Sequence, residues 1–240
     1  MPKTVAIVQS NYVPWKGYFD LLRAADEFVL YDGVQYTRRD WRNRNRIKTA
    51  DGTQWLTVPV EVKGKYAQAI RETRVSDRGW AENHLTRLRH AYGKAPFWRD
   101  HQPLLTELYA EAAGDEFLSA VNARFIRRLC AVLGIATRIT DSAVYQLDNP
   151  DPSGRLLDVC LQAGATEYLS GPAAKSYLDE GLFRAAGVTV RYMDYAGYPE
   201  YPQLHGPFDH AVSVIDLLVM TGPRAAEDLA RNPGAERGAA

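Results

Sequence analysis

Short apolar runs and amphipathic segments alternate through the first part of the chain. Residues 4–9 (TVAIVQ) form a β-branched apolar run, which is typical of a buried strand. Residues 18–25 place Phe19, Leu22 and Ala25 on one face of a helix, and residues 27–32 (EFVLYD) predict a second strand. A strand, a helix and a strand within about 30 residues predict a βαβ unit, whose strands are parallel and whose crossover is right-handed.

The same alternation continues along the rest of the chain. It predicts further strands over residues 54–60, 67–75, 135–140, 168–169 and 188–193. It predicts helices over residues 80–92, 103–112, 117–133, 153–163, 172–178, 182–186 and 212–220. Residues 54–60 and 67–75, with a hinge at Gly64, are expected to pair as an antiparallel hairpin. We therefore expect an α/β fold: a mostly parallel central sheet flanked by helices, with a basic β-hairpin insertion.

Composition narrows the class of protein. The 240 residues are 46% hydrophobic and 24% charged, ordinary values that exclude intrinsic disorder for the bulk of the chain. From Arg224 onward the sequence is rich in Ala, Arg, Gly and Pro, which favours a frayed end. We expect a single domain over residues 1–222 and a flexible tail over residues 223–240.

Charge and apolar runs set expectations for partners and location. Lys and Arg number 29, and so do Asp and Glu, so the chain lacks the basic excess of a general nucleic-acid-binding protein. No apolar run approaches the 18–20 or so residues that cross a bilayer, and the N-terminus lacks a signal-peptide pattern. Two cysteines without metal-type spacing are typical of a reducing cytosol. We expect a cytoplasmic protein with no membrane partner.

The standard catalytic motifs are absent. The sequence has no G-x-x-x-x-G-K-[ST], G-x-G-x-x-G, G-x-S-x-G or H-E-x-x-H pattern, and no His/Cys cluster with zinc spacing. The sequence therefore excludes four protein classes: classical P-loop, dinucleotide-binding, α/β-hydrolase and zinc-protease proteins. We expect no metal and no resident cofactor.

A first candidate cluster follows the first predicted strand: Gln9, Tyr12, Trp15 and Tyr18. Open α/β sheets bind ligands at the carboxyl ends of their strands. The helix that starts near Gly17 would direct free N–H groups to the same place, where they can hold an anion. The alternative is that Trp15 and Tyr18 simply cover the sheet.

The second cluster combines Asp32 with a basic segment. Between residues 38 and 48 there are six basic side chains, five of them Arg, against one acid, Asp40. Arginine binds phosphate or carboxylate through a fork of two N–H groups. A solvated face is the alternative, but this run is interleaved with Trp and Asn, which solubility alone does not require. The candidates are Asp32, Trp41, Asn43, Arg44, Asn45, Arg46 and Lys48.

The remaining candidates lie further along the chain. His84 and Tyr92 share one predicted helix, where His84 is either a general base or a half-buried structural residue. Ser170 and Gly171 lie between a strand and a helix, where they either cap the helix or hold an oxyanion. A rigid Pro- and Gly-containing loop carries Tyr201, Gln203 and His205.

Two further residues are more typical of a protein interior. Cys160 lies on the apolar face of a predicted helix and is expected to be inert. Asp216 lies within an apolar run, where a carboxylate requires a partner. We expect that partner to be an arginine of the basic segment or a backbone cap.

An ordered set of these stretches resembles the WbqC-like protein family over about residues 3–222. The resemblance rests on V-A-I-V-Q-S-N-Y-V-P-W-K-G-Y-F (5–19), A-D-E-F-V-L-Y-D-G-V-Q-Y (25–36), W-R-N-R-N-R-I-K (41–48), W-L-T-V-P-V (55–60), W-A-E-N-H-L (80–85), A-Y-G-K-A-P-F (91–97), Y-L-S-G (168–171), Y-P-Q-L-H-G-P-F (201–208) and S-V-I-D-L-L (213–218). The sequence departs from the family pattern at Ser10, where a Pro usually follows the Gln. The resemblance implies small-molecule biosynthesis of surface polysaccharides or natural products. It also suggests that the clusters form one site.

The leading hypothesis is an acyl- or aminoacyltransferase that forms an amide on an amino sugar or similar amine. A thioester donor, carried by CoA or by an acyl-carrier protein as partner, requires neither metal nor ATP. His84 would deprotonate the amine, with Ser170 and Asp32 as the other catalytic candidates. Backbone amides at Ser170–Gly171, or the Asn43 and Asn45 side chains, would hold the oxyanion.

The donor and the acceptor also need binding residues in this hypothesis. The basic segment would hold a phosphopantetheine or a diphosphate, and Tyr12 and Trp15 would stack on a ring. Two alternatives stay open. One is a nucleotide-dependent ligase or nucleotidyltransferase, for which Asp26 and Asp32 would serve magnesium. The other is a non-catalytic module of a biosynthetic complex.

Overall fold

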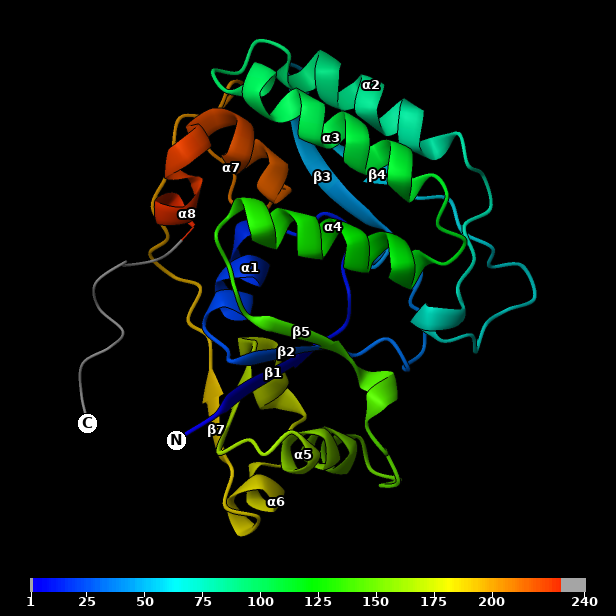
Figure 1. Cartoon of the computed structure of the whole chain (residues 1–240), viewed down its shortest axis with the longest axis vertical. Helices are drawn as coiled ribbons and strands as arrows, with labels where there is room; N and C mark the ends of the chain where they lie inside the picture. Colours follow the sequence, from blue (N-terminus) through cyan, green and yellow to red (C-terminus); the bar gives the residue numbers. More distant parts are fainter. Residues whose placement is uncertain (1, 230–240) are drawn as a thin grey trace.

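A central sheet of five parallel strands separates two layers of helices (Figure 1). The computed structural model describes residues 2–229. The strands are β1 (Thr4–Val8), β2 (Glu27–Leu30), β5 (Arg138–Asp141), β6 (Glu167–Ser170) and β7 (Thr189–Tyr192). Their order is β5-β2-β1-β6-β7, and each neighbouring pair is parallel. The expected α/β fold with a parallel sheet is confirmed.

Alternation along the strands explains the two layers. Ala6 and Phe28 point into one core, with α1 (Lys16–Arg23) and α4 (Leu118–Val132). Val5, Ile7 and Val29 point into a second core, under α5 (Pro152–Gln162) and α6 (Glu180–Ala185). Successive side chains of a strand point to opposite faces, so apolar runs such as TVAIV bury both faces of the sheet.

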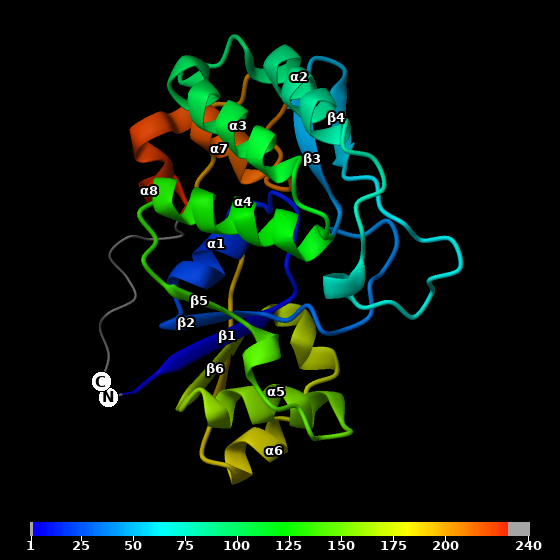
Figure 2. The ribbon, with the colours of Figure 1, turned by 45° about the vertical axis from the view of Figure 1, so that its right-hand side comes forward.

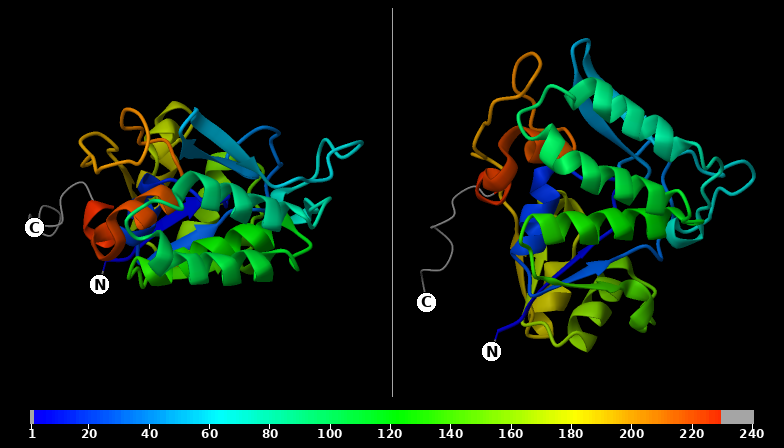
Figure 3. Two further views of the ribbon diagram at one scale, coloured as in Figure 1. Left: turned by 90° about the horizontal axis from the view of Figure 1, so that it is seen from above. Right: turned by 45° about the horizontal axis from the view of Figure 1, so that its top comes forward.

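A further layer lies above the sheet (Figures 2 and 3). It consists of α2 (Trp80–Tyr92) and α3 (Trp98–Ala112), the hairpin of β3 (Arg44–Thr49) and β4 (Gly52–Thr57), and the helices α7 (Val214–Thr221) and α8 (Ala225–Asp228). Helix α2 packs on β3, and α3 packs on α4 and α7. Short 3₁₀ helices connect these elements at Ile70–Glu72, Ser142–Val144, Pro172–Ser176 and Gly222–Arg224.

The basic hairpin exists, but different strands form it. Residues 44–49 pair antiparallel with residues 52–57 across the turn Ala50-Asp51, and Gly52, which follows the turn, has φ +99°. Glycine adopts this conformation without the steric cost that a side chain imposes. Residues 67–75, expected as the second strand, contain a 3₁₀ helix and three isolated bridges, of which only Val60–Val75 joins them to residues 54–60. The expected pairing of 54–60 with 67–75 is therefore wrong.

Helical structure continues past residue 222, where the end of the domain was expected. Residues 225–228 form α8, in which Ala225 is buried, and Leu229 is fully buried beside it. These apolar side chains close the end of the core around α7. The rest of the expected tail, residues 230–240, lies outside the described residues.

The strand order fixes where a ligand would bind. Beginning at β1, the chain first adds β2 and β5 on one side and later adds β6 and β7 on the other. The direction of winding therefore changes between β1 and β6. In open α/β sheets the crevice beyond the carboxyl ends of such strands is the usual binding position. Gln9 follows β1 at this point, and Gly171 follows β6.

Candidate functional site

An aromatic wall stands beside the carboxyl ends of β1 and β6. The Trp15 ring packs edge-on against Tyr195 at 5.1 Å and Tyr198 at 5.9 Å between centroids. A Cβ atom on Gly17 would collide with the Trp15 indole, so glycine is required for this ring position. Gly171 lies next to the Tyr195 hydroxyl. The wall therefore joins Trp15, expected from the sequence, to Tyr198 of the Pro- and Gly-containing loop and to Tyr195, which the sequence reasoning missed.

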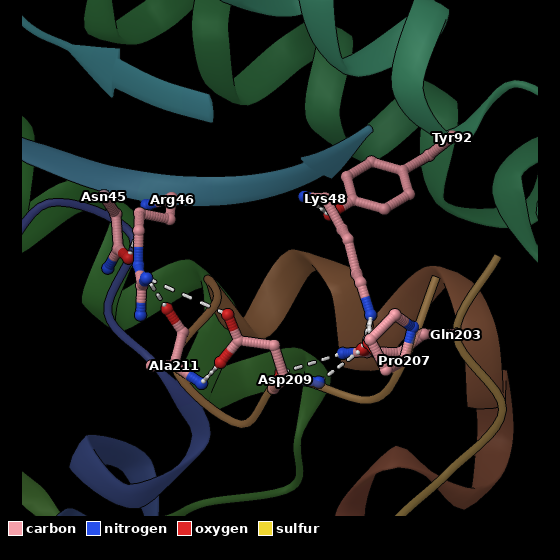
Figure 4. A network of polar contacts seen from close by, with 8 residues as sticks. All are labelled: Asn45, Arg46, Lys48, Tyr92, Gln203, Pro207, Asp209 and Ala211. Carbon is pink, nitrogen blue, oxygen red and sulfur yellow. Dashed lines mark hydrogen bonds and ion pairs between the residues drawn. The ribbon is translucent and has the colours of Figure 1, made fainter. Parts of the chain in front are cut away.

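The outward row of β3 is basic and faces the loop that precedes α7 (Figure 4). The Arg46 Nε donates to the Ala211 carbonyl at 3.0 Å, and its guanidinium lies 3.8 Å from the Asp209 carboxylate. The Lys48 ammonium donates to Gln203 Oε1 at 2.7 Å and to the Pro207 carbonyl. These contacts bring together segments more than 150 residues apart in the chain.

The other end of this row is open to solvent. Trp41 and Trp55 are 40% and 37% exposed, and their rings pack at 5.3 Å between centroids. The Arg44 guanidinium lies 4.0 Å from the Trp55 ring centroid, and that of Arg46 lies 5.9 Å from both rings. We call Trp41, Arg44, Arg46 and Trp55 the hairpin face. It presents flat π surfaces and positive charge together, which suits a ligand that combines a ring with phosphate or carboxylate.

His84 belongs to a buried aromatic–histidine cluster: Tyr12, Trp80, His84, Tyr109 and Phe125. The His84 Nδ1 and the Tyr12 hydroxyl are 2.9 Å apart, and the Tyr12 and Tyr109 hydroxyls are 2.7 Å apart. His84 is 3% exposed. Burial, with a smaller effect from Arg87, lowers the pKa of His84 to about 4, so the ring is neutral at pH 7. The imidazole and the Tyr12 hydroxyl are therefore committed to each other inside the core.

Several expected binding residues hold the backbone together. Asn43 donates to the Val58 carbonyl at 2.8 Å, and Asn45 donates to the Tyr12 and Val13 carbonyls. The Tyr92 hydroxyl accepts from the Lys48 N–H at 2.9 Å. These hydrogen bonds hold the hairpin and the loop after β1 in position. The role of the three residues is therefore to position the backbone of the site.

The remaining expected residues have equally local partners. The Tyr18 hydroxyl donates to the Gln9 carbonyl at 3.2 Å, and the Ser170 hydroxyl donates to Tyr168 at 3.3 Å. The His205 Nε2 lies 3.2 Å from the Ala91 carbonyl. Gln9 and Gly171 are half-buried at the strand ends.

The Asp216 carboxylate is fully buried, and its partners differ from those expected. Oδ1 accepts from the Tyr201 hydroxyl at 2.8 Å and from Gln203 Nε2 at 2.9 Å. An arginine or a backbone cap was expected, but the loop before α7 supplies neutral donors instead. Burial raises the pKa of Asp216, and these hydrogen bonds oppose the rise. The carboxylate thus holds two site residues, Tyr201 and Gln203, in position.

Two cationic or basic groups near the wall were missed by the sequence reasoning. The Lys16 ammonium donates to the Pro199 carbonyl at 2.7 Å and lies 5.2 Å from the ring centroids of Tyr198 and Tyr201. Burial lowers the pKa of Lys16 to about 8. His210 packs on Phe208 at 4.5 Å between centroids, and burial lowers its pKa. Its buried Nδ1 has no hydrogen-bond partner among residues 2–229.

A polar cluster lies beneath the loop after β1. Asp32 Oδ1 accepts from the Ser10 N–H at 2.8 Å, and Asn122 donates to the Ser10 hydroxyl at 3.0 Å and to the Arg42 carbonyl at 2.9 Å. The Arg42 guanidinium donates to Asn11 Oδ1. Of these residues the sequence reasoning chose only Asp32. An amide inside the apolar stripe of helix 118–132 was the available signal for Asn122.

Three further observations concern metal binding, membrane-spanning helices and a cavity in the described part of the chain. Residues 2–229 contain no group of three or more His, Cys, Asp or Glu side chains suited to a metal ion. Within the same residues no helix has both the length and the apolar character to cross a membrane. A shallow cavity beside α6, lined by Glu180 and Arg184, lies at the opposite, amino end of β7. The chemistry-bearing side chains are therefore concentrated at the carboxyl edge of the sheet and around the hairpin.

Comparison with known proteins identifies the family of the chain. The model of the WbqC-like protein family matches residues 9–228, a span that runs from the end of β1 through α8. The chain belongs to the WbqC-like protein family. An uncharacterized protein of Mycobacterium tuberculosis (strain ATCC 25618 / H37Rv), Rv1507c, is 48% identical over 227 residues, which cover 95% of this chain and 97% of that protein. No solved structure matches.

Proposed function

We propose that this WbqC-like protein is a cytoplasmic biosynthetic transferase that moves an acyl or aminoacyl group from a thioester to a primary amine, such as that of an amino sugar. The observation that carries the proposal is the hairpin face. Two exposed indoles under two guanidinium groups would bind the phosphate-bearing arm of a CoA or acyl-carrier-protein thioester. The acyl group and the amine would then bind at the carboxyl ends of β1 and β6, beside the aromatic wall.

The reaction needs one base and no redox partner. The amine nitrogen attacks the thioester carbonyl, the N–C bond forms, the C–S bond breaks, and the departing thiolate takes up the proton that the amine loses. Buried His84 is poorly placed for that proton. His210 is a better candidate, because the residue is only half-buried and its lowered pKa keeps the ring neutral at pH 7. The ring centroids of His210 and Tyr198, a residue of the aromatic wall, are 6.5 Å apart.

Thermal unfolding in the presence of ligands tests the donor site. A thioester of CoA at 100 times its dissociation constant would add about 2.7 kcal/mol, which raises Tm by roughly 5–11 °C for a chain of this size. The variants Arg44→Ala and Trp55→Ala are expected to lose this shift. Matched controls are Tyr66→Ala, at an exposed tyrosine outside the hairpin face, and Arg128→Ala, at an arginine that pairs with Glu107 on α3; both variants should keep the shift.

Activity tests the chemical step. The expected result is amide formed from an acyl thioester and an amino sugar, with a loss of at least tenfold in kcat for His210→Gln and little change in KM for the donor. Full activity in both Arg44→Ala and His210→Gln would contradict the proposal. Donor binding without turnover of any amine would support the alternative that the protein is a non-catalytic binding module.

The strand order favours a second candidate, a nucleotide-dependent ligase or nucleotidyltransferase. The winding reverses between β1 and β6, the position at which doubly wound sheets bind nucleotides. This candidate requires ATP with magnesium to stabilise the protein, and AMP or pyrophosphate to appear with substrate. A Tm shift with ATP and magnesium but none with thioesters would decide for it.

A further inference from the structure

Positive charge is concentrated in two segments of the chain, although the whole chain carries 29 basic and 29 acidic side chains. Residues 35–48 and 61–71 together hold nine Lys and Arg side chains against two acidic ones. The rest of the chain therefore carries an excess of acidic side chains. Separation of charge within a neutral protein creates a local field that attracts a partner of opposite charge.

The two acidic side chains of these segments already have cationic partners. The Asp40 carboxylate lies 3.6 Å from the Arg42 guanidinium, and Glu61 forms an ion pair with Lys65. Lys63 is exposed and makes no hydrogen bond or ion pair with any of the described residues. Basic side chains such as Lys63 therefore keep an uncompensated charge at the surface.

Hydrogen bonds hold the two segments side by side and next to the hairpin face. The exposed Arg38 guanidinium donates to the Val62 carbonyl at 2.7 Å, so Arg38 lies beside the loop that carries Lys63. A carbonyl is neutral and leaves the charge of Arg38 uncompensated. The Arg44 guanidinium of the hairpin face donates to the Arg39 carbonyl. The basic segments therefore form a surface that is continuous with the hairpin face.

Arg39 has a left-handed backbone conformation, with φ +58°. A glycine or an asparagine adopts this conformation with less strain than an arginine. The Arg39 side chain is exposed and makes no hydrogen bond or ion pair within residues 2–229. Strain at a residue whose side chain serves no contact of the fold is typical of a functional position. We call Arg38, Arg39 and Lys63 the docking surface.

The docking surface distinguishes between the two thioester donors of the proposed function. CoA and an acyl-carrier protein bear the same phosphopantetheine arm, for which the hairpin face provides the binding groups. Only the carrier protein adds a folded part around the point where the arm is attached, and in acyl-carrier proteins that part is strongly acidic. Three exposed cations beside the site of the arm are complementary to such an acidic face.

We infer that the docking surface binds the acidic face of an acyl-carrier protein, whose arm then reaches the hairpin face. The inference rests on the proposed amide-forming function and assigns it a protein-bound donor.

Binding of an acyl-carrier protein in its apo form, which lacks the arm, tests the docking surface by itself. The probe is an apo acyl-carrier protein of bacterial fatty-acid synthesis, titrated into the full-length protein by isothermal titration calorimetry. The wild type is expected to bind this probe. Arg39→Glu and Lys63→Glu are each expected to weaken binding at least tenfold, because each replaces an attraction by a repulsion.

Both side chains lack contacts with the fold, so both variants are expected to fold. The wild type carries the test even if they do not, because its affinity for the probe should fall at least tenfold when the salt rises from about 0.05 M to about 0.3 M. Arg184→Glu is the matched control, at an exposed arginine beside α6 and the amino end of β7. Its affinity for the probe should stay within twofold of wild type.

Three results would overturn the inference: no binding of the apo probe by the wild type, wild-type affinity in both Arg39→Glu and Lys63→Glu, or tighter binding of a tRNA than of the carrier protein. The Tm shift with a CoA thioester is a separate measurement on the hairpin face, and the docking-surface variants should keep it. Loss of carrier binding with that shift intact refutes only this inference. Absence of the shift in the wild type, with carrier binding intact, refutes the proposed arm site instead.

Discussion

The hairpin face and the aromatic–histidine cluster have similar ingredients and opposite environments. Both combine large rings with a nitrogen-bearing side chain that can be cationic. In the hairpin face, Trp41 and Trp55 are more than a third exposed and lie under arginines. In the cluster, Tyr12 and Phe125 are 0% exposed and surround a neutral His84. Sequence reasoning chose residues from both as binding or catalytic candidates.

The difference shows what each combination does for the protein. Rings that pack edge-on around a histidine inside a core stabilise the fold, because they bury apolar area and satisfy one another's polar atoms. Rings held at the surface under guanidinium groups stabilise little and remain available to a ligand. Variants of the aromatic–histidine cluster should therefore lose mainly stability, and variants of the hairpin face should lose mainly ligand binding.

The largest effect is expected from Phe125→Ala. Its ring packs against Tyr12 at 5.4 Å and Tyr109 at 4.9 Å between centroids, and removing it leaves a cavity in the core. Such a change typically costs about 3–5 kcal/mol. Urea unfolding at pH 7 measures it. A loss below about 1 kcal/mol would mean that the cluster does not carry the fold.

A smaller effect is expected from the protonation of His84. The pKa of His84 in the folded protein, about 4, lies below the ordinary histidine value of 6.5, so the unfolded chain binds the proton more tightly. The stabilisation is complete above about pH 6.5 and is lost as the pH falls toward 4. Between pH 7 and pH 5 the wild type should lose about 2 kcal/mol more than His84→Gln.

The measurement is urea unfolding of both proteins at the two pH values. Exposed His90 on the same helix provides the control, because His90→Gln should lose stability with falling pH as the wild type does. An identical pH dependence in wild type and His84→Gln would mean that the imidazole titrates freely and is accessible to solvent, as a catalytic base would be.

The smallest effect on stability is expected on the hairpin face. Exposed cation–π pairs contribute about 0.5–1 kcal/mol, so Trp55→Ala and Arg44→Ala should each destabilise the protein by about that amount. A double-mutant cycle of the two changes should give a coupling energy in the same range. The same variants should weaken thioester binding at least tenfold. A large loss of stability with unchanged binding would mean that the hairpin face stabilises the fold and does not bind the ligand.

The parallel sheet was predictable because its strands are apolar on both faces. Runs such as TVAIV and EFVL admit few other readings once a helix separates them. The hairpin strands were harder to place, because β3 buries Asn45 at an inward position where a strand usually buries an apolar side chain. The amide serves the Tyr12 and Val13 carbonyls, so its role depends on a loop more than 30 residues earlier.

The candidate site was predictable only in part, for the same reason. The basic and aromatic character of the hairpin face is visible in the sequence, but exposure is not. His84 fits a catalytic pattern until the tyrosines around it are known. Lys16 and His210 become notable only through their surroundings in the folded chain, whereas Asn122 is visible in the sequence as an amide inside an apolar stripe.

The register of β1 has a consequence for synthesis. Thr4 pairs with Glu167, so one edge of β1 stays open during synthesis until residue 167 has emerged. At 5–20 residues per second that interval is about 8–33 s. An unpaired, β-branched strand is prone to bind other chains during such a wait. Strand β1 is therefore a segment for which chaperone protection during synthesis would matter.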